Sequence, residues 1–183
     1  MNSKIVLCGE AGVGKSAYMN RLTGVWQPKY VATLGLETWQ YNANAEHISA
    51  EGTTCNEHFT FDVYDLAGQN KFAGPVEDLM KEADAVIVMF DVTNRESARN
   101  VGKWIDLAQS NAPGAPIFLV ANKIDLHTRR VTQRNLSNYV SAEHLAALTD
   151  TIELSVRSCY NFDKPFLSIA RHLTGNELKF TYW

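Results

Sequence analysis

The stretch GEAGVGKS, Gly9–Ser16, decides the fold of this 183-residue chain. The apolar run KIVLC before it predicts a buried strand, and residues 15–23 after it predict a helix. Glycines in such a loop let backbone N–H groups turn inward, and the following helix N-terminus attracts anions. The spacing therefore predicts a phosphate-binding loop. The residues expected to contact the phosphates are Glu10, Ala11, Gly12, Val13, Gly14, Lys15, Ser16 and Ala17.

Two residues of this loop have individual roles in the prediction. Lys15 is placed to reach the terminal phosphates of a nucleotide, and Ser16 is placed to ligate Mg²⁺ through its hydroxyl. A glycine turn in front of a helix is the alternative interpretation. The order of strand, loop and helix favours the phosphate site over that alternative.

The segment DLAGQ, residues 65–69, follows a second predicted strand and fits the chemistry of phosphoryl transfer. Asp65 can hold Mg²⁺, Gly68 can offer its N–H to a terminal phosphate, and Gln69 can orient an attacking water. Thr33, between the first helix and the next strand, can ligate Mg²⁺ and meet the same phosphate. Loss of that phosphate would release the Thr33 segment, which predicts a two-state switch.

The segment NKID, residues 122–125, predicts a base-recognition site at the end of an apolar strand. The Asp125 carboxylate can accept two N–H bonds from guanine but finds no such donors on adenine. The stem of Lys123 can pack on a base face. Taken alone, NKID also fits a surface turn. Residues that could complete the base pocket are Asn122, Ser155, Val156 and Arg157, with Trp26 either stacked on the base or buried in the core.

The remaining pattern alternates strands with helices. Residues 83–92 and 115–124 are apolar and rich in β-branched residues, as central parallel strands are. The polar stretch 43–57 is interpreted as a long hairpin tip, and residues 95–110 and 161–174 as helices. We predict one α/β domain over residues 1–183, with a six-stranded, mostly parallel mixed sheet flanked by about five helices.

Composition narrows the class of partner. Hydrophobic residues make up 45% of the chain, the formal net charge is −3, and the three cysteines are widely spaced. A net negative charge disfavours nucleic acid as a direct partner, and the cysteine spacing indicates reduced thiols. The chain shows neither a long apolar run nor a lipidation motif. We therefore expect a soluble monomer without a membrane anchor.

The set GEAGVGKS, Thr33, DLAGQ, NKID and LSVRS resembles the Ras superfamily of small GTPases along the whole chain. Longer strings, including KYVATLGLE, FDVYDLAGQNKFAG and YNFDKPFLSIARHL, are similar to the Ran branch, which acts in nuclear transport. The resemblance implies a P-loop NTPase G domain, GTP or GDP with Mg²⁺, and slow GTP hydrolysis. It also implies an exchange factor, a GTPase-activating protein, importin-β-type receptors, and residence in nucleus and cytoplasm.

Several positions depart from the Ran pattern. Asn70 stands where the family usually has Glu, Ala11 stands where many relatives have Gly, and the sequence ends at Trp183 before Ran's acidic tail. These departures keep two alternatives open. One is a GTP-locked binding module or receptor decoy that barely hydrolyses GTP. The other is a Rab-like trafficking switch, which the Ran-like strings disfavour.

Overall fold

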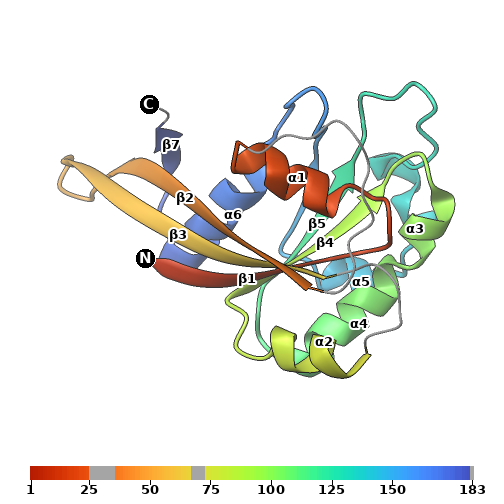
Figure 1. Ribbon diagram of the computed structural model, residues 1–183. Helices are drawn as coiled ribbons and strands as arrows, with labels where there is room; N and C mark the ends of the chain where they lie inside the picture. Colours follow the sequence, from red (N-terminus) through yellow and green to blue (C-terminus); the bar gives the residue numbers. More distant parts are fainter. Residues whose placement is uncertain (25–35, 67–72, 182–183) are drawn as a thin grey trace.

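A computed structural model describes residues 1–24, 36–66 and 73–181 (Figure 1). Its strands form a seven-stranded sheet in the order β6-β5-β4-β1-β3-β2-β7. β1 pairs in parallel with β3 and β4, and the parallel ladder continues through β5 to β6, whereas β2 is antiparallel to both neighbours. The strand bounds are β1 Asn2–Cys8, β2 Leu36–Ile48, β3 Thr54–Leu66, β4 Ala85–Asp91, β5 Ile117–Asn122, β6 Asp150–Glu153 and β7 Lys179–Thr181.

Six α-helices and one 3₁₀-helix, η1, lie within the described ranges. The predicted helix over 95–110 is two helices that meet at Asn100, whose N–H still bonds to the Glu96 carbonyl at 3.0 Å. Asn94 caps that first helix by accepting from the Glu96 N–H. The helix bounds are α1 Lys15–Leu22, α2 Ala73–Met80, α3 Arg95–Arg99, α4 Val101–Asn111, η1 Gln133–Asn138, α5 Ala142–Ala146 and α6 Lys164–Thr174.

The sheet has one strand more than predicted, and the hairpin tip is much shorter than the interval 43–57. β2 and β3 remain paired from Leu36 opposite Leu66 to Ile48 opposite Thr54, so the turn covers only residues 49–53. The error arose because few residues of this part of the hairpin face the core. Ala43 and Ala45 are buried, while Asn42, Asn44 and Glu46, which alternate with them, are exposed or half-buried.

The seventh strand, β7, lies against the edge of this long hairpin. It pairs antiparallel with Asn44, Ala45 and Glu46 of β2. Leu178 and Phe180 are buried against the same core cluster as Phe59. The strand was missed because its three residues carry no clear period, and its partner lies far away in sequence.

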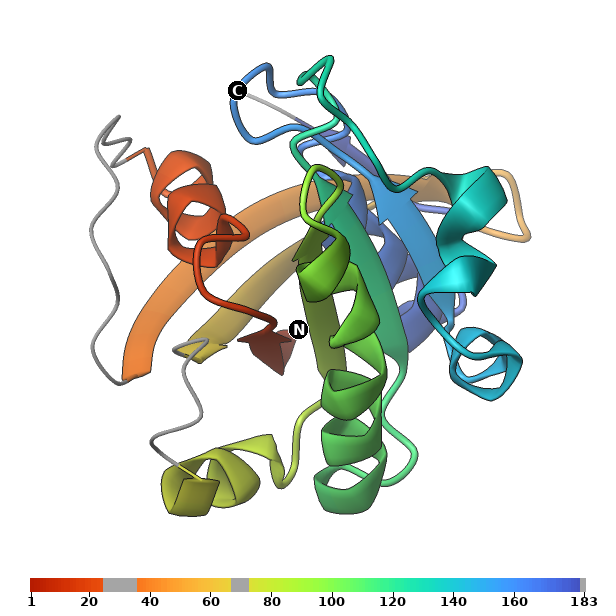
Figure 2. The ribbon, with the colours of Figure 1, turned by 90° about the vertical axis from the view of Figure 1, so that its right-hand side faces the viewer.

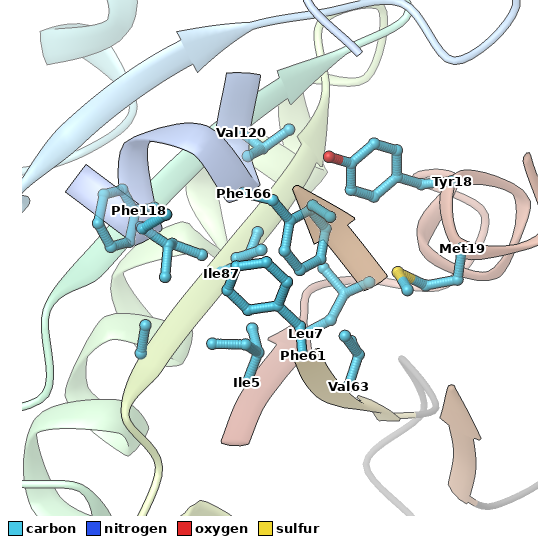
Figure 3. Packing of buried hydrophobic residues seen from close by; sticks show 14 of the residues in the cluster. Ile5, Leu7, Tyr18, Met19, Phe61, Val63, Ile87, Phe118, Val120 and Phe166 are labelled. Atoms are coloured by element: carbon cyan, nitrogen blue, oxygen red, sulfur yellow. The ribbon is translucent and has the colours of Figure 1, made fainter. Parts of the chain in front are cut away.

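Helices cover both faces of the sheet, as the alternating pattern predicts. In Figure 2, α3 and α4 lie in front of the central strands and α6 lies behind them. β1 is buried on both sides: Ile5 and Leu7 belong to the cluster packed by α1 and α6, and Val6 to the cluster packed by α4. Phe166 of α6 packs 5.0 Å from the Phe61 ring (Figure 3). Within the described ranges, no helix has the length and apolar character of a membrane span.

We expect Phe180→Ala to lower the free energy of unfolding by about 3 kcal/mol. This is the lower end of the range for replacing a buried Phe by Ala, because Phe180 lies at the margin of the core. The side chain is 5% exposed, so its removal leaves a cavity under the β2–β3 hairpin. Urea denaturation followed by circular dichroism measures the change. Ile48→Ala is the matched control, because Ile48 is 74% exposed at the hairpin end. Equal stabilities for the two variants would contradict the packing role of β7.

Candidate functional site

Four strand ends bring the predicted motifs to one edge of the sheet. β3, β1, β4 and β5 are neighbours and run parallel, so their carboxyl ends lie together. The loop Gly9–Ser16 follows β1, Asp65 lies near the end of β3, and Asp91 and Asn122 end β4 and β5. The sequence motifs therefore converge where ligands bind in open α/β sheets.

Two glycines allow the loop to pack against the ends of β4 and β5. Gly9 has φ +137°, and a Cβ there would lie 2.1 Å from the Met89 carbonyl oxygen. Gly14 has φ +110°, and its Cβ would lie 2.4 Å from Nδ2 of Asn122. A side chain at Gly9 would displace the backbone of β4, and a side chain at Gly14 would displace the buried amide of Asn122. The two motif glycines are thus required by close packing as well as by loop conformation.

Lys15 begins α1 and places its ammonium inside the loop. Its Nζ donates to the carbonyl oxygens of Gly9 at 2.8 Å and Glu10 at 3.0 Å. The residue is only 6% exposed, and burial lowers the pKa of Lys15, while the charges of Asp65, Cys8 and Glu10 oppose that shift. A desolvated cation within a ring of backbone groups suits a polyanionic ligand such as a di- or triphosphate.

Two of the three predicted metal ligands meet next to this loop. The Ser16 hydroxyl donates to Oδ2 of Asp65 at 2.5 Å. Burial raises the pKa of Asp65 to about 6, although the Ser16 hydrogen bond and the Lys15 charge act in the opposite direction. Oδ1 of Asp65 is buried and has no hydrogen-bond partner among the described residues. A hydroxyl beside an unsatisfied carboxylate oxygen fits Mg²⁺, which prefers hard oxygen ligands.

Asn122 joins the phosphate loop to the predicted base pocket. Its Nδ2 donates to the Val13 carbonyl at 2.9 Å, and its Oδ1 accepts the N–H groups of Lys123 at 2.7 Å and Val156 at 3.2 Å. The side chain is 2% exposed. Because all three bonds are buried or partly buried, Asn122 fixes the phosphate loop and the base-pocket loops relative to one another. Its predicted contact with a base stays a prediction.

Lys123 crosses from NKID to the phosphate loop. Its Nζ donates to the Gly12 carbonyl at 2.7 Å and pairs with Oδ2 of Asp91, also at 2.7 Å. Asp91 is itself held by the N–H and hydroxyl of Thr93. With both ends of the side chain fixed, the aliphatic stem of Lys123 is held in place, as its predicted contact with a base face requires.

Asp125 and Ser155 form the other part of the predicted base pocket. The Ser155 hydroxyl donates to Oδ1 of Asp125 at 2.7 Å and accepts the Ser158 N–H at 3.0 Å. Asp125 is exposed, so its carboxylate is accessible to a ligand. Arg157, in the same loop, is also exposed, whereas Ala17 on α1 packs partly against the core.

A family model supplies the comparison that decides the class of protein. The model of the Ras family matches residues 4–175, which is most of the chain. The chain belongs to the Ras family. It is accordingly a small GTPase with a Ras-type G domain, and Ras-family GTPases bind GTP or GDP with Mg²⁺. The family also implies regulation by exchange factors and GTPase-activating proteins.

Part of the predicted Ras-family site falls outside the described ranges. This holds for four residues that the sequence assigns to nucleotide, metal or water: Trp26, Thr33, Gly68 and Gln69. Their roles stay predictions.

Two residues that touch the predicted site were not assigned to it from the sequence. Asp91 orients Lys123, and its position at the end of a buried strand was the available signal. Trp104 is 8% exposed and packs in the core, yet its indole also contacts Glu10 of the phosphate loop. That contact joins residues far apart in sequence, which no local pattern reports.

Proposed function

We propose that this Ras-family GTPase is a Ran-like GDP/GTP switch that acts in nucleocytoplasmic transport and binds importin-β-type receptors in its GTP form. The observation that carries the proposal is the series of Ran-like strings, KYVATLGLE, FDVYDLAGQNKFAG, MFDVTNRES and YNFDKPFLSIARHL, spread along one chain. The proposed locations are the nucleus and the cytoplasm, between which such a switch passes.

The proposed chemistry is hydrolysis of GTP to GDP and phosphate. Lys15 and the N–H groups of the phosphate loop bind the terminal phosphates and stabilise their developing charge. Ser16, Thr33 and Asp65 would hold Mg²⁺, which neutralises phosphate oxygens when bound. Gln69 orients the attacking water, and the Gly68 N–H binds the terminal phosphate. No residue of the sequence is an evident arginine finger, so the proposed intrinsic rate is slow.

Gln69→Leu is expected to lower single-turnover GTP hydrolysis at least about tenfold without changing nucleotide affinity, because leucine cannot orient a water. Phosphate release from preloaded protein measures the rate, and fluorescent GDP displacement measures the affinity. Gln133→Leu on η1 is the matched control at an exposed position. Hydrolysis at the unmodified rate in the Gln69 variant would show that this glutamine does not orient the water.

A GTP-locked binding module is the second candidate, and Ala11 is the observation that favours it. Ala11 is exposed in the phosphate loop, and its φ is not positive. The backbone therefore accepts the methyl group without strain, and the proposed effect of the methyl is to crowd the terminal phosphate of bound GTP. Undetectable turnover in the presence of an activating protein, with GTP still bound, would favour this candidate.

The transport role is tested by binding to an importin-β-type receptor. The protein is loaded with GDP or with a non-hydrolysable GTP analogue and titrated with the receptor. The proposal predicts a large preference for the GTP-analogue form, because a ligand shifts a two-state element only through differential affinity. Binding in both states would indicate a decoy-like module. Binding in neither state would overturn the transport role and favour a trafficking switch.

A further inference from the structure

Trp104 contacts the phosphate loop through a hydrogen bond that the proposed chemistry does not use. It lies on α4 and its indole Nε1 donates to Oε1 of Glu10 at 3.3 Å, across 94 residues of sequence. Trp104 is 8% exposed and packs within the cluster that covers one face of the sheet. The Glu10 carboxylate is thus bound to a rigid, buried side chain outside the loop.

Glu10 is linked to Lys15 in two ways. Its carbonyl oxygen accepts the Lys15 ammonium at 3.0 Å, and its carboxylate charge favours the charged form of that ammonium. A carboxylate within a phosphate-binding loop repels phosphate and attracts the same lysine that phosphate requires. Its position therefore determines how strongly it competes with a bound nucleotide.

We infer that Trp104 is a positioning residue of the nucleotide site: it holds the Glu10 carboxylate against α4 and away from the terminal phosphate of GTP. The inference rests on the proposed function, since it requires a site that distinguishes GTP from GDP. Without the indole N–H, the carboxylate is free to pair with the Lys15 ammonium. The affinity for GTP then falls more than the affinity for GDP, because GTP carries an additional phosphate charge and interacts more strongly with Lys15.

The test measures the affinities of GDP and β,γ-imido-GTP by fluorescent nucleotide displacement for a set of four variants. Trp104→Phe retains the aromatic packing but removes the donor, and Glu10→Gln removes the charge. The third variant combines these two changes. Trp39→Phe is the matched control, because Trp39 is on β2 and its Nε1 is buried without a partner among the described residues.

Trp104→Phe is expected to weaken GTP-analogue binding about tenfold, which is the size of one lost hydrogen bond to a charged group. GDP binding is expected to weaken by less than about threefold. The double variant is expected to regain the wild-type ratio of the two affinities, because glutamine carries no charge. Trp39→Phe is expected to leave both affinities unchanged. Rescue by the Glu10 change is a result that loss of packing alone would not give.

Two results would overturn the inference while leaving the nucleotide site intact. One is an equal loss of GDP and GTP-analogue affinity in Trp104→Phe, which would indicate a purely structural role. The other is a double variant with the same affinity ratio as Trp104→Phe. Wild-type protein that binds neither nucleotide would overturn the proposed function, and the inference with it.

Discussion

Lys15→Ala is expected to lower the affinity for GDP and GTP by about a thousandfold or more. The ammonium is nearly buried inside the phosphate loop and donates to the carbonyls of Gly9 and Glu10. Phosphate oxygens would replace these neutral acceptors with charged ones. Loss of two or three charge-assisted hydrogen bonds in a desolvated site is worth about 4 kcal/mol, which corresponds to that affinity change.

The same substitution is not expected to unfold the protein. Burial lowers the pKa of Lys15, so the folded chain gains no stability from enclosing that charge. The nucleotide-free variant should therefore melt at or above the temperature of the nucleotide-free wild type. Lys103→Ala, at an exposed position of α4, is the control for removing a lysine. Nucleotide titration calorimetry that finds less than a tenfold loss for Lys15→Ala would contradict the assigned role.

Asp125→Asn is expected to lower guanine-nucleotide affinity by about a hundredfold to a thousandfold, since one N–H of guanine then faces an amide donor instead of a carboxylate. In the wild-type protein the Ser155 hydroxyl donates to Oδ1 of Asp125, and the carbonyl of an asparagine at this position can still accept that bond. The pocket is therefore kept while base recognition changes. Xanthine offers a carbonyl where guanine has its amino group, so xanthosine diphosphate should bind the variant better than GDP does.

Competition between GDP and xanthosine diphosphate measures this reversal in a single experiment. Asp78→Asn is a suitable control, because Asp78 is an exposed carboxylate on α2 that pairs with Lys81. The control should keep the wild-type preference for GDP. If the Asp125 variant also keeps the preference for GDP, Asp125 does not recognise the base.

The sequence predicted the parts of the site that depend on short-range pattern. Gly9 and Gly14 mark positions where no side chain fits. Asp65 lies near the end of β3, and Asn122 is the last residue of β5. A parallel sheet collects such ends on one edge, so the convergence of the motifs follows from the strand order. The contacts Ser16–Asp65 and Asp125–Ser155 agree with the metal and base pockets expected from the motifs.

The parts that the sequence did not predict depend on contacts between distant segments. β7 is recognisable only through its pairing with β2, and the hairpin looked like a loop because its outward residues are polar. Asn122 has a structural role that the sequence did not show, because its side chain bonds to Val13 and Val156 and so joins two loops. Lys123 and Trp104 likewise have partners that no local period reveals.

The most direct test of the account is titration of nucleotide-free wild-type protein with GDP, GTP and ATP, each with and without Mg²⁺. The account predicts tight binding of GDP and GTP that Mg²⁺ strengthens through Ser16 and Asp65, and ATP binding weaker by at least about a thousandfold. Comparable affinities for ATP and GTP would contradict the base pocket at Asp125. Affinities that do not change with Mg²⁺ would contradict the metal site.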